Sequence, residues 1–183
     1  MKALHPIFIL AIAYVAVFLE ASFGGIRHVL GVQIDLLPAL MVYTGLNYAP
    51  FMIGLSAVFG GLLFDSFSLN PLGVSMLPLL CIGLVVYRGR EILSRDDPTI
   101  QFFFGMAASA AQPLAVLFIL MNLGTLPLLG WKSLWQWIVL ALGGGLFTPV
   151  CFALCNRLHL AFDYQPAAQA PFRADRQIKR GRS

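Results

Sequence analysis

Long apolar runs, separated by short polar or glycine- and proline-containing breaks, follow one another along most of the chain. Six such runs cover about 6–23, 34–48, 50–67, 71–87, 100–122 and 133–156. A transmembrane β-strand would alternate apolar and polar residues over short segments, and these runs do not. Their lengths suit helices that cross a bilayer. The pattern predicts an all-α polytopic membrane protein with six transmembrane helices.

The first two runs need separate arguments. The first run resembles a signal peptide, but its apolar core is too long, and cleavage after Ala21 would place Leu19 where a small residue belongs. We therefore interpret it as a retained anchor. The second run is short and is entered past Asp35 and Pro38, so we expect a tilted or partly re-entrant helix.

The later breaks predict helix ends and kinks. Asn70 followed by Pro71 is a start signal for the fourth helix, because asparagine caps exposed amides and proline is tolerated at the first helical position. Pro113 and Pro149 lie inside the fifth and sixth runs. We expect both prolines to kink their helices and the freed carbonyls to be satisfied within the bundle.

Composition and charge agree with a membrane protein. Of the 183 residues, 59% are hydrophobic and 11% are charged, whereas a soluble domain carries roughly 25% charged residues. With six spans, one side of the membrane holds Arg27 and Lys132. The other side holds Lys2, Arg88, Arg90, Arg95, Arg157, Arg173, Arg176, Lys179, Arg180 and Arg182. This asymmetry predicts that both termini are cytoplasmic.

The chain divides into a six-helix transmembrane domain, 1–162, and a basic cytoplasmic tail, 163–183. The tail has few apolar residues to bury, so we expect it to be disordered or to lie on anionic lipid headgroups. Anionic lipid also accounts for the net charge of +4 without a nucleic-acid partner.

Two acidic residues lie near the ends of apolar runs. Asp65 is interpreted either as a carboxylate that reaches interfacial water or as a functional or interhelical group. Its charge is unfavourable at a helix C-terminus, and we expect Asn70 to be the better cap for the next helix. For Glu20 we favour snorkelling or a pair with Arg27 over a buried contact. Neutral polar residues of the fifth run are expected to form hydrogen bonds within the bundle: Gln101, Gln112 and Asn122.

Small residues recur at four-residue spacing, which allows helices to approach closely. The pairs are Ser56 with Gly60, Ala57 with Gly61, Gly105 with Ser109, Ala107 with Ala111, and Ala141 with Gly145. We interpret them first as internal packing, with binding of a partner's membrane helix as the alternative.

The chain offers little for catalysis or metal binding. Cys81, Cys151 and Cys155 fall in apolar runs without a clustered histidine, and are interpreted as structural thiols. No histidine lies within a span to serve an intramembrane serine protease, and phosphate-binding and zinc motifs are absent. We therefore expect a protein that is not an enzyme and that has no cofactor or metal.

The run from Gly60 to Asp65, GGLLFD, is followed by Asn70-Pro-Leu-Gly73. This arrangement resembles the signature of the rod shape-determining protein MreD family, in which an apolar helix ends in glycine and aspartate and Leu-Gly opens the next helix. Other features recur in the same order: Glu20 near the first helix end, Asp35 and Pro38 before the second helix, a charged loop after the fourth, and Pro149 in the last. The resemblance covers roughly residues 1–160.

The resemblance implies a non-catalytic, multi-pass component of the bacterial inner membrane that supports rod shape and lateral peptidoglycan synthesis. The implied partners are MreC, bound directly, and MreB, RodA and a penicillin-binding transpeptidase. It also implies a fold similar to the substrate-binding subunits of ECF vitamin transporters. The alternative function is therefore small-molecule binding in such a transporter. The candidate functional or partner-contact residues are Asp65, Asn70, Pro71, Leu72, Gly73, Gly60, Gly61, Glu20 and Pro149.

Overall fold

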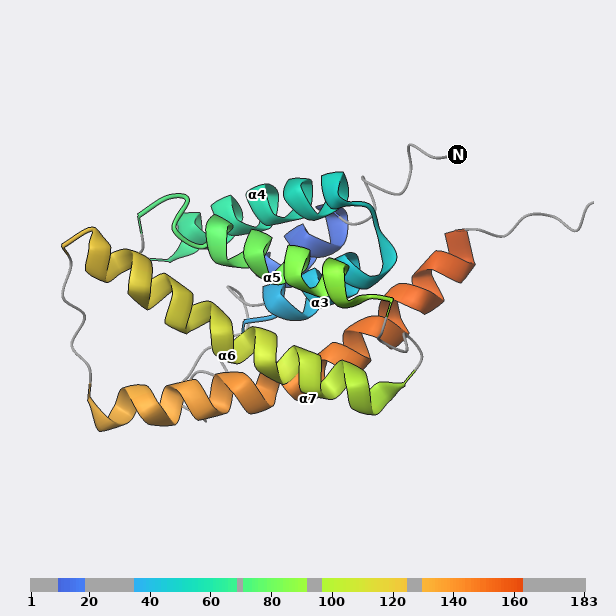
Figure 1. Ribbon diagram of the computed structural model, residues 1–183. Helices are drawn as coiled ribbons and strands as arrows, with labels where there is room; N and C mark the ends of the chain where they lie inside the picture. The colour runs from blue at the N-terminus through green and yellow to red at the C-terminus, as the bar shows by residue number, and fades with distance from the viewer. Residues whose placement is uncertain (1–9, 19–34, 69–70, 92–96, 125–129, 163–183) are drawn as a thin grey trace, which may run out of the picture.

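The computed structural model describes residues 10–18, 35–68, 71–91, 97–124 and 130–162 (Figure 1). Regular secondary structure in these ranges is helical and includes no strand, which confirms the prediction of an all-α fold for this part of the chain. Besides a helical segment at 10–18, the elements are α3 (Leu37–Asn47), α4 (Pro50–Phe67), α5 (Met76–Gly89), α6 (Pro98–Asn122) and α7 (Trp131–Phe162).

Three of the described helices are long and apolar enough to cross a membrane: Pro50–Phe67, Pro98–Asn122 and Ser133–Leu158. By contrast, α3 has 11 residues and α5 has 14. At 1.5 Å per residue, α3 rises by about 16 Å, roughly half the thickness of a hydrocarbon core. The expectation of a short second helix is therefore confirmed. Six complete spans and cytoplasmic termini stay predictions.

Helix α3 forms the centre of the bundle. Ten of its 11 residues are buried, and it packs against α4, α5, α6 and α7. Two hydrophobic clusters meet on it: Val42 and Tyr43 belong to one, and Leu37 and Met41 to the other. Figure 1 shows α3 enclosed between α4 and α5 on one side and α6 and α7 on the other. Its uniformly apolar sequence fits this position, because a helix that is hydrophobic all round has no face for water.

The outer surface of the bundle is also apolar. Large side chains such as Phe118 on α6 and Leu146 on α7 are 69% and 64% exposed. Contiguous apolar surface of this kind is unusual on a water-soluble monomer, and lipid is the solvent that suits it. The composition and the arrangement of side chains therefore agree on a membrane protein.

Helices α6 and α7 approach closely at small residues. A Cβ atom on Gly105 would lie 1.9 Å from Thr148 Oγ1, and one on Gly144 would lie 1.7 Å from Ser109 Oγ. Nearby, Trp137 Nε1 donates a hydrogen bond to the Ala110 carbonyl at 2.9 Å. Trp137 is therefore partly an internal residue, whereas the side chains of Trp131 and Trp135 are exposed, as expected for an interfacial belt.

Two predicted helix boundaries are wrong. The fourth apolar run becomes α5 only at Met76, because residues 71–75 form a turn in which the Val74 amide donates to the Pro71 carbonyl at 3.3 Å. Helix α7 is longer than predicted and continues through Pro149 to Phe162. Figure 1 shows that α7 changes direction along its length, in agreement with the expected kink.

Candidate functional site

The Asp65 carboxylate connects the end of α4 to the start of α5. Its Oδ2 atom accepts hydrogen bonds from the backbone amides of Gly73, at 2.8 Å, and Ser75, at 3.1 Å. The side chain is 2% exposed. The interpretation of Asp65 as a carboxylate in interfacial water is therefore wrong, and the interhelical alternative is supported.

The electrostatic argument against Asp65 as a cap is also wrong. Although its own helix presents a negative dipole end, the carboxylate receives two amides from the residues that lead into α5. A helix N-terminus carries partial positive charge and unpaired amides, so it stabilises an anion there. Asp65 thus accepts amides of the turn that leads into α5. Asn70 lies outside the described residues, so the expectation that it caps the next helix stays a prediction. Asp65 Oδ1 and Ser75 Oγ are buried without a hydrogen-bond partner.

Gly73 is required by the backbone of this turn. Its φ is +92°, a left-handed value that glycine adopts without steric cost. An added Cβ atom would meet no atom within 4 Å, so the requirement concerns backbone conformation and not a close approach within the chain. Pro71 and Leu72, in the same turn, are exposed.

Gly60 and Gly61 fix the distance between α4 and its neighbours. A Cβ atom on Gly61 would lie 2.8 Å from the Met76 Cα atom, and one on Gly60 would lie 3.0 Å from Leu37 Cδ2. Backbone cannot move aside cheaply, so the start of α5 can rest on α4 only where position 61 lacks a side chain. The turn and these glycines therefore form one structural unit.

The remaining candidate residues do not join this unit. Pro149 lies half-buried within α7. Glu20, like Asn70, lies outside the described residues. Among the candidates that the structure describes, all except Pro149 therefore belong to the group around Asp65.

A second buried polar contact joins Asp35 and Gln112, and the sequence did not predict that these two residues meet. Asp35, just before α3, is 8% exposed, and its Oδ1 atom accepts the Leu37 amide at 2.9 Å. Its Oδ2 atom accepts a hydrogen bond from Gln112 Nε2 on α6. Gln112 is 4% exposed, and its Oε1 atom has no partner. The prediction that Gln112 forms a hydrogen bond within the bundle is confirmed.

The sequence contained part of this signal. Asp35 and Gln112 were each noticed as polar residues at or within apolar runs, but 77 positions separate them. Pairing them requires knowledge of which helix faces meet. Asn122, treated in the same way, instead donates to the Phe118 carbonyl of its own helix at 2.7 Å.

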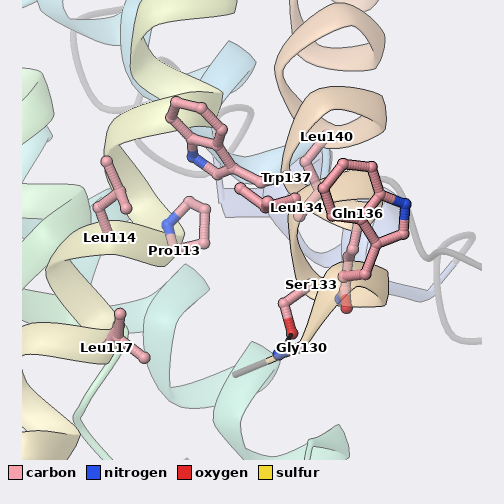
Figure 2. A pocket seen from close by; sticks show the side chains of 10 residues that line it. Pro113, Leu114, Leu117, Gly130, Ser133, Leu134, Gln136, Trp137 and Leu140 are labelled. Atoms are coloured by element: carbon pink, nitrogen blue, oxygen red, sulfur yellow. Dashed lines mark hydrogen bonds between the residues drawn. The ribbon is translucent and has the colours of Figure 1, made fainter. Parts of the chain in front are cut away.

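An apolar pocket of about 750 Å³ lies between α6 and α7. In Figure 2, Pro113, Leu114 and Leu117 of α6 face Leu134 and other side chains of α7 across it. Its polar side chains are Ser133, Gln136 and the indole groups of Trp131 and Trp137. None of them is an acid or a base, so the pocket is suited to an apolar molecule rather than to chemistry.

Metal-binding and nucleophilic groups are sparse in the described part of the chain. No three residues among its histidines, cysteines, aspartates and glutamates lie close enough to hold a metal ion. Cys151 and Cys155 place their sulfur atoms 3.9 Å apart on one face of α7, as their spacing predicts. Cys155 is fully buried against the Tyr43 cluster, which agrees with a structural role.

No model of a known protein family matches the chain, and no curated protein or solved structure matches it either. The resemblance to MreD is therefore carried by residues 60–73 and by the order of features along the sequence.

Proposed function

We propose that this chain is a non-catalytic subunit of the bacterial cell-elongation complex, similar to MreD, that supports lateral peptidoglycan synthesis by binding MreC in the inner membrane. The observation that carries the proposal is the bond from Gly73 to Asp65. The described residues that resemble the MreD signature lie together at one connection between two helices, which the buried Asp65 carboxylate holds by two hydrogen bonds. A defined connection of this kind supports a scaffold role, and residues 71–75 carry no acid, base or thiol.

The packing of small residues narrows the surface that would receive a partner helix. Four of the five predicted pairs contain buried residues of the bundle: 56 with 60, 57 with 61, 105 with 109, and 141 with 145. Ala107 and Ala111 are both exposed on α6. Small residues let helix backbones approach closely in lipid, so this outward pair is the candidate contact for the single membrane helix of MreC.

The positions proposed for the tail and the termini follow from charge. The basic residues of 163–183 would hold the tail on anionic headgroups at the cytoplasmic face, and both termini would lie there. MreB, RodA and a penicillin-binding transpeptidase would join through the complex.

Purification of the tagged full-length protein from native membranes, read by mass spectrometry, tests the proposal. We expect MreC and cell-wall synthases to be recovered. Ala111→Leu should lower MreC recovery about tenfold, because a clash that costs about 1.4 kcal/mol changes an equilibrium by that factor. The matched control is Ala153→Leu, an exposed alanine on α7. Failure of the wild-type protein to recover MreC would contradict the proposal.

The alternative, a small-molecule-binding subunit of an ECF-type transporter, is favoured by the pocket between α6 and α7. Its volume of about 750 Å³ lies within the range of roughly 300–1,000 Å³ that is usual for ligand sites. Recovery of transporter ATPases in the same purification, or of a small molecule by native mass spectrometry, would support this alternative over the scaffold.

A further inference from the structure

The Asp35 carboxylate is buried in an apolar bundle, and in the described part of the chain its hydrogen-bond donors are neutral. Its partners are the Leu37 amide and the Gln112 side-chain amide. The N-terminus of α3 adds a partial positive charge. An ionised side chain that is buried in a membrane protein is energetically unfavourable unless it is paired. The donors reduce this cost, but they add no full positive charge.

The charged and titratable groups on the elements around α3 lie mostly at its other end. Val86 of α5, near Arg88, and Cys155 of α7, near Arg157, pack against Val42, Tyr43 and Leu46, in the second half of α3. Helix α6 contains no charged residue. At the end that holds Asp35, Leu37 contacts Gly60 of α4, and Asp65 lies five positions beyond Gly60. Helix α4 thus adds a second acid near this end. The helical segment 10–18, which packs in the same cluster through Val17, carries Tyr14 as its titratable group. Glu20, Arg27, His28 and the Lys132 side chain lie outside the described part.

Gln112 supplies the second, independent observation. Its amide lies against Asp35, it is 96% buried, and its Oε1 atom has no donor. A buried acceptor without a donor destabilises the folded protein. Among the described residues, no cationic side chain bonds the Asp35 carboxylate and no donor reaches the Gln112 amide oxygen, so both features belong to the same pair of side chains.

We propose that Asp35 and Gln112 form an internal site for a monovalent cation, either a proton or Na⁺, at the N-terminal end of α3. A proton would form an O–H bond on Asp35 Oδ2. The Gln112 amide would rotate, give up the hydrogen bond that Nε2 now donates to Oδ2, and accept the new hydroxyl through Oε1. Na⁺ would instead be held by carboxylate and amide oxygens, which suit a hard cation. Either cation neutralises the acid and uses the orphaned oxygen. This inference is independent of the proposed scaffold function.

The test measures thermal unfolding of the full-length protein in phosphatidylcholine nanodiscs from pH 5 to pH 9, in sodium chloride or choline chloride. A site that takes up a proton in the folded protein stabilises it at low pH, and this stability is lost as pH rises. If the cation is a proton, the loss is the same in both salts. If it is Na⁺, the melting temperature in sodium chloride is higher by about 3–6 °C at a tenfold excess over the dissociation constant.

Asp35→Asn should abolish whichever response is found, whereas Asp65→Asn should preserve it. If Asp35→Asn does not fold, Gln112→Leu keeps the acid and removes the amide oxygen, and the size of the response must change. The proposal is overturned if wild type responds to neither cation, or if the response is unchanged in Asp35→Asn or Gln112→Leu. It is also overturned if a response appears only in Arg27→Gln, since Arg27 would then be the counter-ion of Asp35.

Discussion

Asp65 and Asp35 are both buried carboxylates beside the start of a short helix, but their partners differ in kind. Asp65 is bound by two backbone amides, 8 and 10 positions along the chain. Asp35 is bound by one adjacent amide and by a side chain 77 positions away. The first contact shapes a local connection, whereas the second joins the central helix to α6.

The difference determines how each contact responds to mutation. Backbone amides remain whatever side chain is introduced, so removal of Asp65 leaves two donors without their acceptor. The partner of Asp35, in contrast, is the side chain of Gln112, which a mutation can remove. Removing both members of a buried polar pair is nearly neutral, whereas removing one leaves an unpaired group.

The largest effect is expected from Asp65→Leu, which should lower the free energy of unfolding by roughly 2–4 kcal/mol because the part-buried Gly73 amide and the buried Ser75 amide lose their acceptor. Asp65→Asn keeps an acceptor oxygen and should cost less. Reversible unfolding in mixed detergent micelles measures both. Equal losses for the two variants would show that charge, and not the acceptor geometry, stabilises the turn.

The second-largest effect is expected at Asp35, where, unlike at Asp65, the partner side chain can be replaced as well. Asp35→Leu should lower the free energy of unfolding by roughly 1–3 kcal/mol, because the Gln112 amide is left without a partner. In the double variant Asp35→Leu/Gln112→Leu, most of this loss should be recovered, and the remainder reflects the Leu37 amide. A double-mutant cycle on the same unfolding assay checks this. Additive losses would indicate that the two side chains do not interact.

Gly73→Ala should cost about 1–2 kcal/mol of the same free energy, from backbone strain at its positive φ alone, since space for the methyl group is open. The matched control is Gly54→Ala in α4, where a Cβ atom also meets nothing within 4 Å. There alanine should stabilise by about 0.5–1 kcal/mol, because glycine is unfavourable inside a helix. A similar sign for both variants would contradict the argument from conformation.

The smallest effect is expected from Ser75→Ala. The Ser75 hydroxyl is buried without a partner, whereas its backbone amide binds Asp65. Deleting the hydroxyl should therefore leave stability unchanged or raise it by less than about 1 kcal/mol. A clear loss would reveal a hydrogen bond of that hydroxyl in the membrane.

Prediction from sequence succeeded where the determining interactions are local. The all-α fold and the short helix after Asp35 follow from run lengths, proline and glycine. The start of α5 was predicted too early because Asn70-Pro71 has the usual sequence of a helix start. In the structure, the Gly73 and Ser75 amides bond the Asp65 carboxylate of α4, and the helix begins only at Met76. Whether Asp65 is buried was also left open, because its hydrogen bonds to residues 73 and 75 depend on the tertiary structure.

The amino-acid sequence by itself determined that this chain is helical and apolar and that its polar residues are few, because helix formation and partition into lipid depend on neighbouring residues and on composition. Only the tertiary structure decided that α3 is the buried centre, that four small-residue pairs are used within the bundle, and that Asp35 meets Gln112. These features depend on which helix faces come together, and uniformly apolar helices carry no stripe that would specify it.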